Sequence, residues 1–233
     1  GVRTRCSGTR QRADGLDDPP LATDDLAGIF FVHANFDENR TVLGIARRDL
    51  QIVGKLDERA HDTFHVRHLT EADFEDVRQR GVIGMIPGEI VTTDNGYSDR
   101  VDLEKDILKI AVIERHKNTG KMGVGIVKGY GIRGGAIASS VSHDSHNIIV
   151  VGDNDHDMML AVKELIRDQG GYVLVCDGEI YGTLPLPVMG LMSDAGYEKV
   201  NAAMGRMIPK AHEMGVKEGF DPFITLSFMA LPV

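Results

Sequence analysis

The chain has 233 residues, of which 42% are apolar, and a formal net charge of −9. The apolar fraction is sufficient for a hydrophobic core and excludes wholesale disorder. The acidic balance argues against a surface for nucleic acid or anionic membranes, and no apolar run is long enough to predict a transmembrane helix. Because Cys6 and Cys176 are the only cysteines, we expect no disulfide framework and a cytoplasmic, reducing environment.

The first 64 residues differ from the rest of the chain. Residues 1–26 contain Gly, Arg, Asp and paired prolines with few apolar side chains, which predicts a disordered tail. Short strands are predicted at 29–33 and 42–46. We therefore interpret residues 27–64 as the remnant of a small β element attached to a larger domain, residues 65–233.

Three histidines, His61, His65 and His68, follow at spacings of four and three. On a helix they would share one face and could bind a metal ion. The segment also alternates in the manner of an edge strand. We favour the edge strand and predict no metal site here.

The middle of the chain has mostly β character. Thr70 followed by Asp73 is a helix-start signature. Asn95–Gly96 predicts a tight hairpin turn. A run rich in β-branched residues after Asp106 and a glycine-containing run after Gly120 predict an antiparallel pair. The predicted strands are 82–86, 90–93, 107–115 and 122–132.

Two helices are predicted in the last third of the chain. The first begins at a cap, Asn154 or Asp155, and ends before Gly170–Gly171. The second covers residues 197 to about 214, with apolar side chains at helical spacing. Between them, Asp177–Gly178 predicts the turn of a β-hairpin.

The last predicted element is a strand at 222–231, where apolar residues alternate. Since no polar tail follows it, we expect the chain to be truncated at this end. Hairpins combined with a few helices predict an α+β fold: a mixed, mostly antiparallel sheet with two or three packing helices. No (β/α)8 barrel is expected, because a barrel needs a long alternation of strands and helices.

A run of six polar residues lies between a glycine-rich segment and the buried strand 148–151. Its members are Ser142, His143, Asp144, Ser145, His146 and Asn147. We expect no self-contained hydrolytic triad, because consecutive residues of an extended segment point to opposite faces. His143 and His146 offer two metal ligands where a tight site needs more, so no metal is assigned. The run either contacts a small ligand or forms an internally satisfied turn.

Several long motifs resemble a known family. The runs ILKIAVIERH, GVGIVKGYGI, GGAIASSVSHDSHNIIVVG, NDHDM, LPLPVMGLMS and DPFITLSFMALPV are similar, in this order, to the C-terminal domain of bacterial and archaeal adenine deaminases. These enzymes belong to the amidohydrolase superfamily. The resemblance covers roughly residues 65–233. It implies a hydrolase that converts adenine and water to hypoxanthine and ammonia.

The resemblance also implies a pair of manganese or iron ions, held in a barrel domain, that activates water. This chain has no His-x-His pair and no barrel, so no metal ligand is carried over to it. Its expected partners are adenine and the barrel domain, and formation of a homo-oligomer stays open. We expect the chain alone to be inactive.

In an intact enzyme, the polar run is expected to face the mouth of the barrel. His143 or His146 would transfer a proton to the leaving ammonia. Adenine would be contacted by Ser142, Asp144, Ser145 and Asn147, the last through its amide. The alternative is a non-catalytic module that packs on a barrel partner or dimerises, with the polar run as an internal turn.

Overall fold

A computed structural model of the chain describes residues 30–31, 60–75 and 80–231. The predicted tail at 1–26 and the predicted strand at 42–46 lie outside the described residues. The helical elements are η3 (Glu71–Phe74), η4 (Leu103–Lys105), α2 (Asp155–Arg167), α3 (Tyr197–Glu213) and α4 (Ile224–Ser227). The strands are β1 (Phe30–Phe31), β2 (Arg80–Met85), β3 (Thr92–Ser98), β4 (Ile107–Ile113), β5 (Met122–Lys128), β6 (Gly135–Ser139), β7 (Ile148–Gly152), β8 (Gly171–Cys176), β9 (Glu179–Pro185) and β10 (Met192–Ser193).

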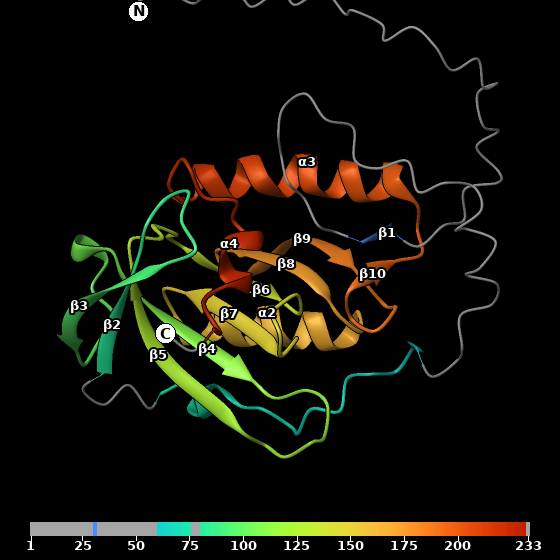
Figure 1. Cartoon of the computed structure of the whole chain (residues 1–233), viewed down its shortest axis with the longest axis horizontal. Coiled ribbons are helices and arrows are strands. Elements are labelled where there is room, and N and C mark those ends of the chain that lie inside the picture. The colour runs from blue at the N-terminus through green and yellow to red at the C-terminus, as the bar shows by residue number, and fades with distance from the viewer. Residues whose placement is uncertain (1–29, 32–59, 76–79, 232–233) are drawn as a thin grey trace, which may run out of the picture.

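One large sheet organises the described residues. Its eight strands lie in the order β3-β2-β5-β4-β7-β6-β8-β9, and β1 pairs separately with β10. Neighbouring strands of the large sheet are antiparallel except β2 and β5, which run parallel. The sheet is open (Figure 1). The predicted α+β fold, with a mixed, mostly antiparallel sheet and no closed barrel in the described part of the chain, is confirmed.

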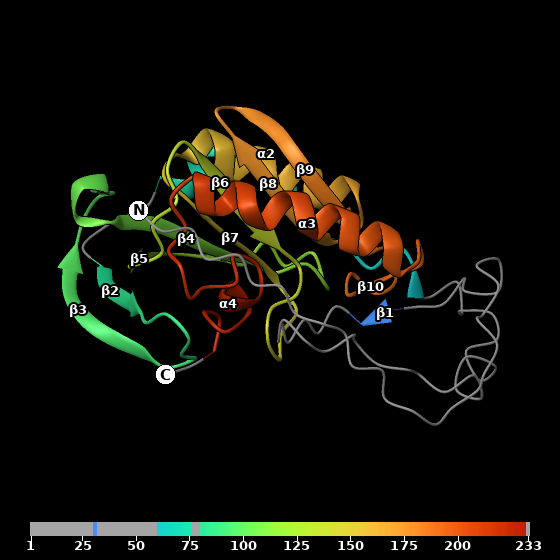
Figure 2. The same cartoon turned by 90° about the horizontal axis from the view of Figure 1, so that it is seen from above.

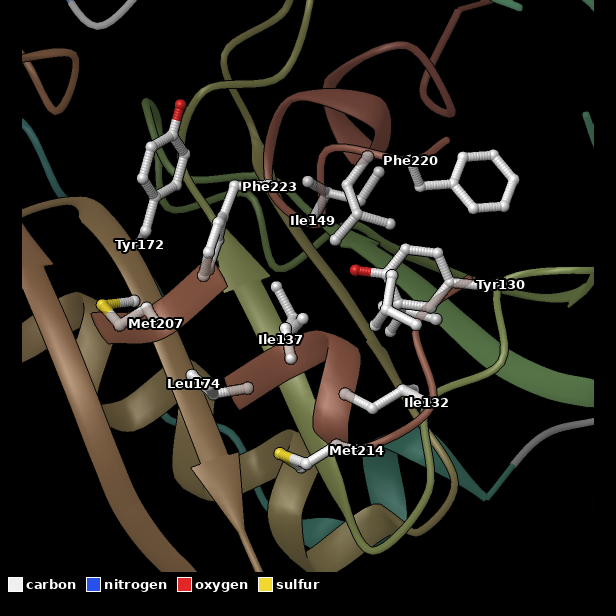
Figure 3. Packing of buried hydrophobic residues seen from close by; sticks show 14 of the residues in the cluster. Tyr130, Ile132, Ile137, Ile149, Tyr172, Leu174, Met207, Met214, Phe220 and Phe223 are labelled. Carbon is white, nitrogen blue, oxygen red and sulfur yellow. The ribbon is translucent and has the colours of Figure 1, made fainter. Parts of the chain in front are cut away.

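Helices cover both faces of this sheet (Figures 1 and 2). Because successive residues of a strand point to opposite faces, the fully buried strand β7 contributes to two cores. Ile149 and Val151 pack with side chains from α3 and α4, whereas Ile148 and Val150 pack with side chains from α2. Figure 3 shows the first core, to which Ile149 contributes together with aromatic and methionine side chains. None of the described helices is long and apolar enough to cross a membrane.

Local signals correctly predicted several elements. β4 and β5 form the expected antiparallel pair. α2 begins after Asn154, whose side chain accepts a hydrogen bond from the Asp157 amide at 2.8 Å. Asp177 and Gly178, with φ of 50° and 80°, form the predicted two-residue turn between β8 and β9. α3 covers almost the whole of the second predicted helix.

The predicted turn at Asn95–Gly96 is wrong. These residues lie inside β3, between the pairs that join β3 to Gly81 and Ile83 of β2, and Gly96 has a φ of 78°. They form a β-bulge, and the chain reverses earlier, between the end of β2 and the start of β3. A bulge uses the same positive φ that a hairpin turn uses, so the dipeptide alone does not distinguish the two.

The predicted strand at 222–231 is also wrong, because the segment forms α4 and turns. The Asp221 carboxylate accepts hydrogen bonds from the amides of Phe223 at 2.9 Å and Ile224 at 2.8 Å. This cap starts a helical turn, and the buried side chains follow at a spacing of three, as at Phe223 and Leu226. The cap therefore outweighs the β character of the apolar residues.

The edge strand predicted around His61–His68 does not form either. Residues 62–70 have no regular secondary structure and are held by individual contacts. One of them is the hydrogen bond from the His65 amide to the Arg115 carbonyl at 2.7 Å. Thr70 and Asp73 then form the predicted capping box, which starts the short 3₁₀ helix η3.

Candidate functional site at the turn between β6 and β7

The six polar residues form the connection between β6 and β7, two central strands of the sheet. We call residues 142–147 the polar turn. The His146 amide donates to the Ser142 carbonyl at 2.7 Å, and Asp144 and His146 have positive φ of 61° and 48°. Non-glycine residues in this left-handed region are strained and persist only when their surroundings hold them. The shape of the polar turn therefore depends on its neighbours.

The side chains of the polar turn differ in exposure, and their arrangement corrects one prediction. The segment is not extended: the His143 Nδ1 lies 3.1 Å from the Asp144 Oδ1 on the same side of the turn. A triad still does not form, because the Ser142 Oγ has no hydrogen-bond partner among the described residues. Ser142 is buried, His143, Asp144 and Ser145 are exposed, and His146 and Asn147 are half-buried.

The polar turn contains some of the unsatisfied polar atoms of the described residues. Within the described part of the chain, the Ser142 Oγ, the His146 Nδ1 and the Asn147 Oδ1 are buried and have no hydrogen-bond partner. Leaving such an atom unpaired costs about 1–3 kcal/mol, so native proteins keep few of them. A second group of such atoms lies at Asp168, Gln169 and Tyr172, so their number alone does not assign a ligand to the polar turn.

The segment around α4 holds one end of the polar turn. The His143 amide donates to the Ser227 carbonyl at 2.7 Å. The His143 ring also stacks on the Phe228 ring, with centroids 5.7 Å apart and an interplanar angle of 28°. These contacts fix the backbone of His143 and leave its ring half-exposed.

Two residues that follow β4 hold the other end, and the sequence interpretation did not identify them as part of the site. The Arg115 Nε donates to the His146 carbonyl at 2.5 Å. The His116 Nε2 donates to the Ser145 carbonyl at 2.8 Å. The only signal in the sequence was the position of two basic residues directly after a buried strand.

The surroundings of His146 lower the pKa of its imidazole. Burial is the main cause, and the positive charge of Arg115 adds to it, followed by His116 and His143. Burial also lowers the pKa of the Arg115 guanidinium to about 10, so this side chain stays charged at neutral pH. His146 is therefore a neutral imidazole near pH 7, able to accept a proton.

The polar turn lies next to the segment that leads into the main domain. Arg115, which binds the His146 carbonyl, also donates to the Thr63 Oγ1 at 3.2 Å. The Met189 amide donates to the Ala60 carbonyl at 2.6 Å, and the Met189 carbonyl accepts from Arg115 at 2.9 Å. Residues 60–63 therefore lie beside the polar turn.

The described residues offer no metal centre. Among them, no group of three or more His, Cys, Asp or Glu side chains could hold a metal ion, at His61, His65 and His68 or elsewhere. They do not fit a metal pair. A shallow, mostly apolar groove lies between residues 66–69 and α2, away from the polar turn, and contains no cluster of reactive groups.

Fold and site together define an α+β domain that presents a polar turn and carries no metal centre in its described part. Sequence comparison then identifies the family. The sequence model of the family "Adenine deaminase C-terminal domain" matches residues 88–233, more than half of the chain. The chain belongs to this family.

Curated relatives are named adenine deaminases. The chain is 39% identical to the adenine deaminase of Nitratidesulfovibrio vulgaris strain Hildenborough over 249 residues, which cover 98% of this chain and 42% of the relative. It is 48% identical to the adenine deaminase of Dehalococcoides mccartyi over 180 residues, covering 71% of this chain and 31% of the relative. The chain thus spans less than half the length of these relatives.

Proposed function

We propose that the chain acts as the C-terminal part of a cytoplasmic adenine deaminase, which converts adenine and water to hypoxanthine and ammonia in purine salvage. The observation that carries the proposal is the family match over residues 88–233, together with relatives that are named adenine deaminases. The manganese or iron pair is assigned to the additional part of the relatives, because the described residues do not fit it. The chain alone is therefore expected to be inactive, and adenine turnover by the purified chain with manganese or iron would contradict this.

Within that enzyme, we assign the polar turn to the wall of the active site. Three unpaired buried atoms, on Ser142, His146 and Asn147, are available for hydrogen bonds to a purine or its surroundings. Asn147 has an amide, which can pair with the edge of adenine. His146, neutral near pH 7, can take up a proton and pass it to the amino group that leaves as ammonia, with His143 exposed beside it. Asp144 and Ser145 complete the exposed side of the turn.

The test is kinetic and uses a full-length relative, such as the Dehalococcoides mccartyi enzyme. Replacing the residues aligned with His143 and His146 by alanine should lower kcat/KM about tenfold or more, because a positioned acid–base group contributes at least that much. Replacement of the residue aligned with His156, which lies on the exposed start of α2, serves as the control. Unchanged kinetics in both variants would remove the polar turn from the catalytic site.

A second function, packing or self-association, is favoured by the β2–β3 hairpin. Its side chains Ile90, Val91 and Tyr97 are 60%, 56% and 75% exposed, and β3 forms one edge of the sheet. Exposed apolar side chains gathered on one element are typical of contact surfaces. In this alternative, the domain packs on the barrel partner or on a second copy, and the polar turn is structural. The histidine variants decide between the two, since a structural turn predicts unchanged kcat/KM.

A further inference from the structure

We propose that Arg115 and His116 are positioning residues, which hold the polar turn in its strained conformation by binding its backbone carbonyls. This inference rests on the proposed function for its catalytic meaning, but its structural content stands on the contacts of this chain alone. Neither side chain has a direct role in the chemistry: His116 binds a main-chain oxygen, and Arg115 binds main-chain oxygens and the Thr63 hydroxyl.

Arg115 is buried in an unusual way. Its side chain is 1% exposed, the largest fully buried side chain among the described residues. Within the described part of the chain it forms no ion pair with a carboxylate, although buried charges normally have one. Backbone carbonyls and the Thr63 hydroxyl accept its hydrogen bonds in place of a carboxylate. The guanidinium also lies over the Phe64 ring, 4.3 Å from the ring centroid.

The bonds of Arg115 join three segments that are far apart in the sequence. The Nε donates to the His146 carbonyl, one terminal nitrogen donates to Thr63, and the other donates to the Met189 carbonyl at 2.9 Å. Only a guanidinium supplies donors in three fixed directions of one plane. Lysine, with one point-like ammonium, cannot reach all three. Arg115 is therefore suited to fixing these three segments relative to one another rather than to filling space in the core.

His116 provides a second, independent hold on the polar turn. It is exposed, so it contributes little to the core, yet its Nε2 donates to the Ser145 carbonyl at 2.8 Å. Its own backbone is held by the Glu114 carboxylate, which accepts hydrogen bonds from the amides of His116, Lys117 and Thr119. The imidazole is thus presented from a fixed loop.

The contacts of Arg115 and His116 both lie at the strained part of the polar turn. Arg115 and His116 bind the carbonyls of His146 and Ser145, and these lie beside the two left-handed residues, Asp144 and His146. Strained backbone persists only where the surrounding contacts over-determine it. Loss of either contact is therefore expected to release the turn, while the sheet below it stays folded.

The experiment is hydrogen exchange of the whole chain, resolved at single amides by NMR. The variants are His116→Ala, His116→Gln and Arg115→Lys. His116→Ala should accelerate exchange of the His146 amide by about fivefold, the worth of one hydrogen bond, and leave the β7 amides unchanged. His116→Gln should restore slow exchange, because its amide nitrogen can donate to the same carbonyl. Arg115→Lys should accelerate the His146 amide further.

Two results would overturn the inference. One is unchanged exchange of the His146 amide in both His116→Ala and Arg115→Lys. The other is equal acceleration of turn and β7 amides, which would show that the residues support the whole domain. The same His116 pair in a full-length relative separates this inference from the proposed function. If His116→Ala frees the turn but leaves kcat/KM unchanged, positioning is supported and the catalytic role of the turn fails.

Discussion

Two connections of the same sheet, the β8–β9 turn and the polar turn between β6 and β7, join neighbouring antiparallel strands by opposite means. The first is formed by Asp177 and Gly178, whose preferred backbone conformations match the hairpin, with one distant contact from the Asp177 amide to the Gly134 carbonyl at 2.8 Å. The second is longer, contains two non-glycine residues with positive φ and no glycine, and is held by α4 on one side and by the end of β4 on the other. A turn built mainly from local preferences is nearly self-sufficient, whereas the polar turn depends on several distant residues.

The largest expected effect on stability comes from replacing Arg115, which supports the polar turn. Arg115→Met should lower the free energy of unfolding by about 3 kcal/mol, because several buried carbonyl oxygens lose their donor at once. Denaturant unfolding measures this. Arg206→Met, on the exposed face of α3, is the matched control and should be nearly neutral. Equal stability of the two variants would show that the polar turn is as self-sufficient as the β8–β9 turn.

A smaller effect is expected at the self-sufficient turn. Gly178→Ala places a side chain at φ 80° and should cost about 1–2 kcal/mol, without changing exchange of the polar-turn amides. Gly123→Ala is the control, because a Cβ there meets no atom within 4 Å. A Gly178→Ala variant that frees the polar turn would contradict the independence of the two connections.

The smallest effect is a pH dependence confined to the polar turn. Since the folded state lowers the pKa of His146 below the ordinary value of 6.5, the unfolded state binds more protons as the pH falls below that value. Stability contributed by neutral His146 is therefore present above pH 6.5 and is lost progressively below it. His146→Gln should flatten the thermal-unfolding profile in this range. If the pH dependence of thermal unfolding is as steep in His146→Gln as in the original chain, the burial of this imidazole is contradicted.

The same comparison explains what could be predicted from the sequence. Strands β4, β5, β7, β8 and β9, helix α2 and the Asp177–Gly178 turn follow from local patterns and were predicted, whereas β6 was not. The polar turn was located, but its conformation and its supports were not. Arg115 lies 31, 52 and 74 residues from the partners it binds, and no local pattern encodes contacts of that separation.

Two of the three wrong predictions have the same origin. Asn95–Gly96 favours the positive φ that both a hairpin turn and a β-bulge require. Only the pairing of β3 with β2 determines which of the two forms. In the segment after Asp221, apolar residues suit a strand or a helical turn, and the carboxylate of Asp221 decides for the turn. In both cases the deciding contact lies outside the pattern that was used.

The bulge in β3 has a consequence for how copies of the protein behave in a crowded solution. A flat outer strand offers a regular row of main-chain donors and acceptors, on which a further strand can add to begin a fibril. The bulge breaks this row where β3 is otherwise open and twists the strand away from a straight template. One extra residue at the rim thus makes β3 a poorer template for a further strand.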